Sequence, residues 1–281
     1  MTSSSAPRPV RRRPSDGSQF GAELAVAVAS AEAAGRLLLA AFGRPSAERR
    51  KGRHDVVTDL DEASERLIMD QLAEAFPADR RLGEESGWSK PHGGDSGRTW
   101  IVDPLDGTIN YAAGLPIWCV SIALAVGPTV VLGVIRDAVH DATFAAIAGE
   151  GTWRLPGRAP LTIRRLRRGA DAVIAADPGV EDDAVADARI RAIRPAVRAI
   201  RLPGSIAWSL TALATGRLDG VLQVRGLQAV DVAAAGLLAH EAGARVTAAD
   251  GGPWIDLAHP TTGRGIAAGR PALHELLVGG R

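Results

Sequence analysis

The sequence has a single cysteine, few aromatic residues and almost no net charge. Cys119 alone cannot form an intramolecular disulfide, and it lies in an apolar run, so we expect a buried thiol and not a nucleophile. With 33 basic and 32 acidic residues, the formal net charge of +1 gives no attraction to nucleic acid or to a membrane surface. Nothing at the N-terminus resembles a secretory signal, so we expect a cytoplasmic protein.

Clusters of histidine and cysteine with the spacing of a zinc site are also missing. The six histidines are scattered along the chain, at positions 54, 92, 140, 240, 259 and 274. A metal site in this protein would therefore use oxygen ligands. Such ligands favour Mg²⁺ over zinc.

The composition is that of a soluble globular protein. At 281 residues, with 46% hydrophobic and 23% charged residues, the chain can bury a sizeable core as one large domain or two intimate lobes. Residues 1–18 are rich in Ser, Pro and Arg, which predicts a disordered tail, with a nucleic-acid-binding arm as the alternative. Residues 20–43 predict one long helix closed by Gly43. Charged positions interrupt its apolar character, so we expect a packed core helix and not a membrane span.

Further elements follow from apolar runs and turn signals. Thr58 and Asp61 have the spacing of a capping box before a helix that runs through Phe76. Ser205 suits the N-cap of a helix that runs to Thr215. The expected strands are 99–102, 118–126, 130–135, 142–147, 172–176 and 220–224. We expect loops at 87–98 and 149–160, a solvated helix at 181–200, and a helix that starts at Asp231.

Two carboxylates three residues apart follow the strand that is expected to end at Val102. Pro104 fixes its own φ and favours an extended Asp103, so Asp103 and Asp106 can project from one tight loop. Gly107 allows close approach of a ligand to the backbone, and Thr108 stands where a helix could begin. Such a loop suits a hard divalent cation and the phosphate that it holds. The alternative for Asp-Pro-Leu-Asp-Gly alone is a simple turn.

The longer string W-I-V-D-P-L-D-G-T-I-N-Y, from Trp100 to Tyr111, resembles the signature of the inositol monophosphatase family of Mg-dependent, lithium-sensitive phosphatases. Three further segments occur in the family's order: D-V-V-T-D-L-D ending at Asp61, Gly83-Glu84-Glu85-Ser86, and D-V-A-A from Asp231. The resemblance implies a mixed α/β fold, a layered α/β/α/β/α sandwich over residues 19–281. Its metal-site lobe would cover about 19–150 and its C-terminal lobe about 151–281. It also implies a homodimer.

The resemblance assigns roles to matching positions. Glu84, Asp103 and the carbonyl of Leu105 would hold a first Mg²⁺; Asp103, Asp106 and Asp231 would hold a second; and a third, weaker ion would lie near Glu84. Asp61 and Thr108 would orient the nucleophilic water with help from Glu84, and Glu85 would fix the geometry of the ligands. Asp106 and the N–H groups of Gly107 and Thr108 would receive the phosphate.

Departures from the family pattern concern the substrate. Val230 stands where the family has a tryptophan. The position of a hydroxyl-binding glutamate is taken by Gln223 if the segment is one residue longer than in inositol phosphatases, and by Val224 otherwise. Gly204 and Ser205 remain candidate substrate contacts, with Arg201 as a candidate at the rim. A site without that carboxylate should discriminate less well for inositol.

The sequence therefore predicts a Mg²⁺-dependent phosphomonoesterase that uses a metal-activated water on a small polyol, sugar, cyclitol or related metabolite phosphate. The alternatives are a 3′(2′),5′-bisphosphate nucleotidase, a fructose-bisphosphatase-like enzyme or a histidinol-phosphate phosphatase. A second phosphate would need a basic pocket, for which Arg164, Arg165, Arg167 and Arg168 are a conceivable source. A homologue that binds a metabolite without turnover is the alternative from a different class.

Overall fold

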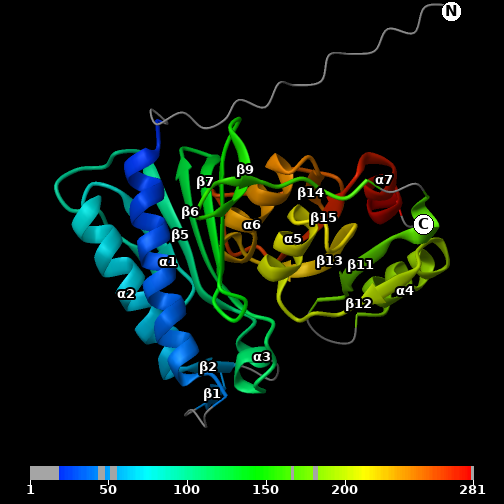
Figure 1. The fold of residues 1–281 in the computed structure, drawn as a ribbon, viewed down its shortest axis with the longest axis horizontal. Coiled ribbons are helices and arrows are strands. Elements are labelled where there is room, and N and C mark those ends of the chain that lie inside the picture. Colours follow the sequence, from blue (N-terminus) through cyan, green and yellow to red (C-terminus); the bar gives the residue numbers. More distant parts are fainter. Residues whose placement is uncertain (1–18, 44–47, 51–55, 166–167, 180–182, 280–281) are drawn as a thin grey trace, which may run out of the picture.

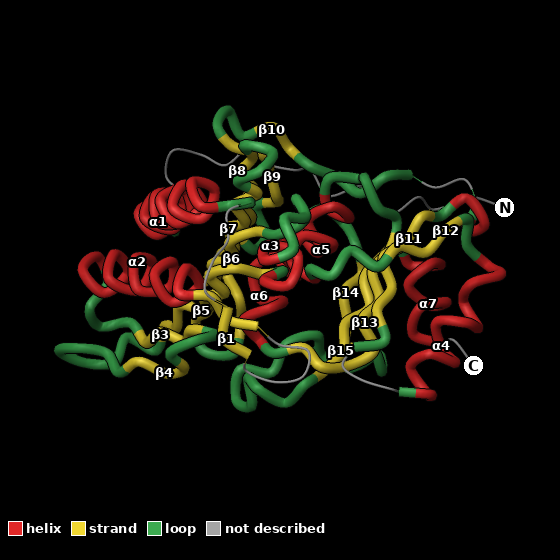
Figure 2. The backbone as a smooth tube through the Cα atoms, turned by 90° about the horizontal axis from the view of Figure 1, so that it is seen from below, coloured by secondary structure: helices red, strands yellow, loops and turns green. Residues whose placement is uncertain are grey.

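Five layers of helices and sheets alternate through the molecule. In the computed structural model, which describes residues 19–43, 48–50, 56–165, 168–179 and 183–279, helices α1 and α2 form one outer layer. Next come a large sheet, the central helices α5 and α6, a second sheet, and the outer helices α4 and α7 (Figures 1 and 2). The predicted α/β/α/β/α sandwich is confirmed. The predicted tail at 1–18 lies outside the described residues.

The larger sheet has eight strands in the order β10-β9-β8-β7-β6-β5-β3-β4. Its strands are β3 (Arg80–Gly83), β4 (Gly87–Ser89), β5 (Arg98–Asp106), β6 (Cys119–Val126), β7 (Thr129–Asp137), β8 (Ala142–Ile147), β9 (Gly151–Leu155) and β10 (Ala159–Pro160). All neighbours are antiparallel except β3 and β5, which run parallel. Both faces of β6 are covered by helices, which explains its nearly unbroken apolar sequence.

The smaller sheet has five strands in the order β12-β11-β13-β15-β14. Its strands are β11 (Val173–Asp177), β12 (Ala199–Arg201), β13 (Gly220–Leu227), β14 (Arg245–Ala248) and β15 (Arg264–Gly269). Strands β11, β12 and β13 are parallel, and their register pairs Asp177, the last residue of β11, with Gln223 near the middle of β13. A separate two-stranded sheet joins β1 (Glu48–Arg50) and β2 (Val56–Thr58).

The first helical layer packs on the outer face of the larger sheet. Helix α1 (Gly21–Ala41) and helix α2 (Asp59–Ala75) contact each other, and α1 also packs against β7. Ser30 donates a hydrogen bond to Gln71 across the two helices (2.7 Å). By length and composition alone, α1 is the one helix among the described residues that could cross a membrane. Its contacts with α2 and β7 are those of a packed helix.

Helices α5 (Ile206–Ala214) and α6 (Ala229–Glu241) lie between the two sheets and contact each other. Helix α6 is buried on nearly all sides and consists largely of alanine and leucine, which allows a close approach to β7. Gly133 on β7 faces the α6 backbone, where a Cβ would come within 2.7 Å of the carbonyl oxygen of Ala234. The remaining helices are α3 (Thr108–Ala112), α4 (Ala184–Ile193) and α7 (Pro271–Gly279), with short 3₁₀ turns at Gly169–Asp171 and Arg194–Ala196.

Several predicted elements need correction. The helix expected at 181–200 is shorter, because Pro195 follows α4 in a 3₁₀ turn and the chain then enters β12. The loop expected at 149–160 contains β9 and β10, whose mixed composition hid the strands, and the loop expected at 87–98 begins with β4. Helix α6 begins at Ala229, two residues before Asp231. Strand β5 continues to Asp106 instead of ending at Val102. The capping prediction for Thr58 concerns a side chain outside the described part of the chain.

We predict that Gly133→Ala lowers the free energy of unfolding by about 1–3 kcal/mol, because the added methyl group overpacks the contact between β7 and α6. Urea unfolding measures the change. The control is Gly21→Ala in α1, where a Cβ has no atom within 4 Å. Equal stability of wild type and Gly133→Ala would contradict the close contact.

Candidate active site

Glu84 and Asp103 meet because β3 and β5 run parallel and in register. Gly83 pairs with Val102, and the N–H of Glu84 donates to the carbonyl of Val102 (3.1 Å). The next residue of each chain segment is a carboxylate, and the two side chains share a hydrogen bond. Their proximity therefore follows from strand register and could not be read from the separation of the two motifs in sequence.

A bulge at the end of β5 places Asp103 and Asp106 on the same site. Asp103 pairs with Ser121 and Asp106 with Cys119, so three steps along β5 match two along β6. In a regular strand, residues three apart point to opposite faces. Asp103 and Asp106 were expected to project together from a tight loop after the strand. They lie instead on either side of a bulge inside the sheet. Cys119, opposite the bulge, is fully buried as predicted.

Each of the three aspartates is oriented by a backbone N–H group. The Oδ1 atom of Asp103 accepts from Leu105 (3.0 Å), Oδ2 of Asp106 accepts from Ala207 at the start of α5, and Oδ2 of Asp231 accepts from Gln228 (2.6 Å). Asp231 is the third residue of α6 and completes a capping box with Gln228. Capping and a role in the site are thus compatible for Asp231.

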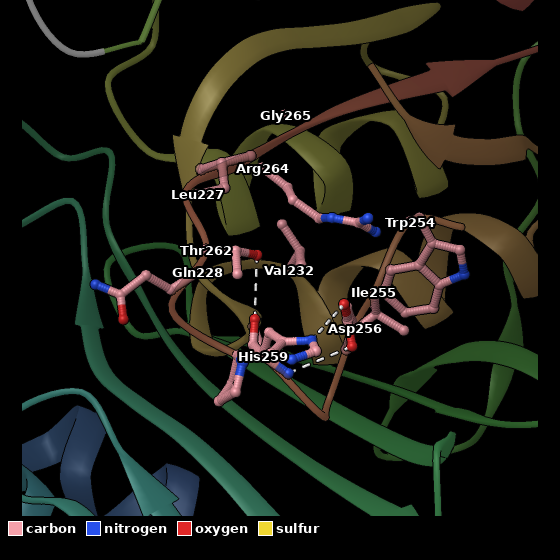
Figure 3. Close-up of a pocket in the computed structure, with 12 residues that line it drawn as sticks. Leu227, Gln228, Val232, Trp254, Ile255, Asp256, His259, Thr262, Arg264 and Gly265 are labelled. Carbon is pink, nitrogen blue, oxygen red and sulfur yellow. Dashed lines mark hydrogen bonds and ion pairs between the residues drawn. The ribbon is translucent and has the colours of Figure 1, made fainter. Parts of the chain in front are cut away.

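Residues 254–262 pack against the start of α6 and hydrogen-bond to it. The carbonyl of Pro260 accepts a hydrogen bond from the N–H of Ala229 (2.7 Å). Figure 3 shows the small cavity beside this contact, where His259 lies against Asp256 and Thr262 donates to the carbonyl of His259. Its volume of about 20 Å³ leaves room for one water molecule and no substrate. The segment therefore supports the helix that carries Asp231.

The four carboxylates line one cavity of about 170 Å³. We call it the carboxylate cavity; its walls include Glu84, Asp103, Leu105, Asp106, Thr108 and Asp231. Burial raises the pKa of Asp103 well above its ordinary value, and the charges of Glu84, Asp106 and Asp231 raise it further. Burial also raises the pKa of Asp106 to about 7, against the lowering effect of its hydrogen bonds with Ala207 and Ser205. No basic side chain among the described residues lines this cavity.

Thr108 links the carboxylate cavity to α2. Its hydroxyl lies 3.2 Å from Oδ1 of Asp61 and 3.0 Å from the carbonyl oxygen of Leu105, so it can donate to either. Asp61 is 1% exposed, in the first turn of α2. Gly107 has a φ of 94°, and a Cβ there would lie 2.8 Å from the carbonyl oxygen of Ile117, so only glycine fits. The N–H groups of Gly107 and Thr108 precede the hydrogen bonds of α3 and have no acceptor within that helix.

Glu65 is a residue of this site that the sequence analysis missed. Its carboxylate is buried and accepts the N–H groups of Glu85 (2.8 Å) and Ser86 (2.8 Å), which fixes the turn that carries Glu84. The same carboxylate occupies the space beside Gly83, where a Cβ would lie 2.6 Å from it. Glu65 follows Asp61 by one helical turn, and this spacing on α2 was the available signal. Glu85, predicted to fix the ligand geometry, lies outside the walls of the carboxylate cavity.

A second, outer cavity of about 550 Å³ adjoins the first and shares Asp106, Ile109, Gly204 and Asp231 with it. Gly204 and Ser205 line it as expected. Ser205 is also the N-cap of α5 and accepts from the N–H of Trp208 (3.3 Å). Asn110 holds the loop before α5 by donating to the carbonyls of Ile117 and Pro203 (2.8 Å each).

Gln223 and Val224 line different cavities. Gln223 lines the outer cavity, whereas Val224 lies on the opposite face of β13, as neighbouring residues of a strand must. Val230 is 2% exposed and belongs to the core, and Arg201 lines neither cavity. Asp177, which the sequence analysis did not select, lies at the end of β11 directly beside Gln223.

Comparison with known proteins shows which family the chain belongs to. The model of the inositol monophosphatase family matches residues 22–280. The chain belongs to the inositol monophosphatase family. It is 34% identical over 259 residues to inositol monophosphatase 2 of Solanum lycopersicum, a match that covers 90% of this chain and 95% of that protein.

Solved structures of the inositol monophosphatase family have the same fold. The structure of the extragenic suppressor protein SuhB from Bartonella henselae is 33% identical, with a TM-score of 0.83 over 92% of this chain and 98% of that one. The inositol monophosphatase from Anabaena is 31% identical, with a TM-score of 0.78 over 94% and 96% of the two chains. The protein is therefore a phosphomonoesterase of the inositol-phosphatase type, in a family that is metal-dependent.

The carboxylate cavity fits a hard divalent cation. Four carboxylates and Leu105, whose carbonyl is a further candidate, line it and can supply oxygen ligands. The carboxylates repel one another, and no basic side chain among the described lining residues offsets this repulsion. Within the described residues, no three His, Cys, Asp or Glu side chains already form a closed metal-binding group. The oxygen ligands of the cavity therefore suit a hard divalent cation.

We predict that Glu65→Gln lowers kcat/KM about 10- to 100-fold, because one of the two N–H groups of the Glu84 turn loses its acceptor, at a cost of about 1–3 kcal/mol. Phosphate release and half-saturation by the divalent metal report the effect; a displaced Glu84 should raise the metal concentration required. Glu62→Gln, on the exposed side of the same helix, is the matched control. Identical metal requirements for Glu65→Gln and wild type would contradict a positioning role.

Proposed function

We propose that the protein hydrolyses a small polyol, sugar, cyclitol or related metabolite phosphate with two to three Mg²⁺ ions per site. The observation that carries the proposal is the cluster of four carboxylates, two of them buried, in a cavity that no basic side chain among the described residues lines. Mg²⁺, when bound, would supply positive charge beside the phosphoryl oxygens. Glu84, Asp103 and the Leu105 carbonyl would hold one ion, and Asp103, Asp106 and Asp231 another. A third ion would lie near Glu84.

The remaining steps fall to residues of the chain. The hydrogen bond between Thr108 and Asp61 leaves the hydroxyl oxygen of Thr108 able to accept from a water molecule, while Asp61 holds the hydroxyl proton. Glu84, at the edge of the cavity, would assist in orienting that water, and Glu85 would support the turn. The phosphate would bind at the segment formed by Asp106, Gly107 and Thr108, where the N–H groups of Gly107 and Thr108 would donate to it. Gly204, Ser205 and Gln223 would contact the alcohol part of the substrate.

The basic run gives no support to a second phosphate. Arg164 pairs with Asp219, which precedes β13, and none of Arg164, Arg165 and Arg168 lines either cavity. Arg167 lies outside the described residues. A homodimer, a cytoplasmic location, and the lack of nucleic-acid and membrane partners stay predictions from sequence.

We predict that Asp103→Asn reduces Mg²⁺-dependent phosphate release more than about 1,000-fold, since both proposed Mg²⁺ sites lose a ligand charge and the ions stabilise the transferring phosphoryl group. Without metal, the variant should melt at the same temperature as wild type or higher, because one of four repelling carboxylates is gone. Addition of Mg²⁺ should no longer raise the melting temperature. Phosphate release and thermal melting measure both effects.

The control is Asp219→Asn, which removes a buried carboxylate that pairs with Arg164. It should lose stability and keep Mg²⁺-dependent activity. Activity of Asp103→Asn within tenfold of wild type would overturn the metal assignment. Equal activity of the wild type with Mg²⁺ and with chelator would overturn the proposed function as a whole.

We predict that Gln223→Glu raises the activity on myo-inositol 1-phosphate relative to phenyl phosphate by about tenfold, because a charged acceptor binds a hydroxyl more strongly than an amide does. The ratio of the two kcat/KM values is the measurement. Gln71→Glu, the same chemical change on α2, is the control. An unchanged ratio would remove Gln223 from the set of substrate contacts.

A further inference from the structure

The outer cavity has no positive charge in its walls. Among the described residues that line it, none is Lys, Arg or His, and three are aspartates: Asp106, Asp177 and Asp231. Asp106 and Asp231 belong also to the carboxylate cavity, where bound cations would compensate them. Asp177 lines the outer cavity and not the carboxylate cavity, so cations bound in the carboxylate cavity would not directly compensate its charge.

Asp177 is held in place by its own turn. Its Oδ1 atom accepts the N–H of Gly179 (2.8 Å), which leaves Oδ2 without a hydrogen-bond partner among the described residues. Burial raises the pKa of Asp177, which means that the half-buried carboxylate lacks sufficient compensation by donors. The parallel register places Asp177 beside Gln223, so an acceptor and an amide lie next to each other at the floor of the cavity.

We propose that Asp177 binds hydrogen-bond donors on the alcohol part of the substrate, and that this substrate carries one phosphate on a hydroxyl- or ammonium-bearing alcohol. The inference rests on the phosphomonoesterase function proposed above and makes Asp177 a specificity-determining residue. Nearby, Ile109 and Leu202 line the cavity and are 55% and 66% exposed, so the carbon skeleton of the alcohol has apolar surface to lie against.

The same charge disfavours a substrate with a second phosphate. A second anionic group in the outer cavity would meet Asp177 without a cation to offset the repulsion. This argues against the bisphosphate nucleotidase and fructose-bisphosphatase alternatives. From sequence, the hydroxyl-binding carboxylate was expected to be missing at the Gln223 or Val224 position of β13; the charged acceptor proposed here stands instead on β11.

The test compares Asp177→Asn with wild type on phosphate esters whose alcohol parts differ. The variant keeps an oxygen for the N–H of Gly179 and loses only the charged acceptor. We expect kcat/KM for myo-inositol 1-phosphate to fall about 10- to 100-fold, the effect of one charge-assisted hydrogen bond. Phenyl phosphate, whose alcohol part has no donor, should change less than about threefold, because it makes no such bond.

Asp250→Asn is the matched control. Asp250 accepts the N–H of Gly252 (2.9 Å) in the same kind of turn, but it lies outside the outer cavity. It should change neither substrate. A uniform loss on both substrates with Asp177→Asn, or no loss on either, would overturn the inference and leave the phosphomonoesterase function standing. Absence of Mg²⁺-dependent hydrolysis by the wild type would instead overturn the function, and the inference with it.

Two further substrate pairs complete the experiment. The wild type should have a kcat/KM for fructose 1-phosphate that is about tenfold or more above that for fructose 1,6-bisphosphate. Asp177→Asn should reduce this ratio, because it removes the repulsion between Asp177 and the second phosphate. Wild-type preference for the bisphosphate would contradict the proposal. A comparison of histidinol phosphate with inositol phosphate distinguishes the two kinds of donor. If Asp177 binds an ammonium group, Asp177→Asn should lower kcat/KM more for histidinol phosphate than for inositol phosphate. The binding of histidinol phosphate to the wild type should then also weaken with added salt.

Discussion

Electrostatic repulsion among Glu84, Asp103, Asp106 and Asp231 is the constraint on which this structure depends. Four carboxylates share one cavity of about 170 Å³, and burial strengthens their repulsion. The fold opposes it with backbone N–H donors from three segments, one for each aspartate. These donors come from the bulge in β5, the start of α5 and the start of α6. The close packing of α6 on β7 then fixes the position of the helix that carries Asp231, together with the Gln228 N–H group that donates to it.

Three glycines allow close packing in the scaffold around the carboxylate cavity. Gly83, Gly107 and Gly204 allow contacts that a side chain would prevent, with Glu65, Ile117 and Asn110 respectively. Each contact joins a segment with a functional residue to another part of the fold. Contacts of this kind orient the side chains that would hold a metal ion.

Much of the site could be predicted from sequence because its chemistry is concentrated in short motifs. Asp103 to Thr108 supply two carboxylates and a hydroxyl within six residues, and the layered fold followed from the resemblance carried by those motifs. The bulge could not be predicted, since it depends on the register of β5 against β6. Glu65 was missed for a related reason: its partners, Glu85 and Ser86, are 20 and 21 residues away. The helix expected at 181–200 is wrong in its second half, because α4 ends at Ile193 and residues 199–201 pair with β11 as a strand.

The carboxylates of the larger sheet and the two proposed alcohol contacts come from different sheets. Glu84 follows β3, and Asp103 and Asp106 lie on β5 of the larger sheet, whereas Asp177 and Gln223 lie on β11 and β13 of the smaller one. Because β11 and β13 are parallel, their register pairs Asp177 with Gln223 in the wall of the outer cavity. Under the proposed function, a substitution at either of these two positions would change which alcohol fits, while the backbone N–H groups that orient the three aspartates of the carboxylate cavity belong to other elements.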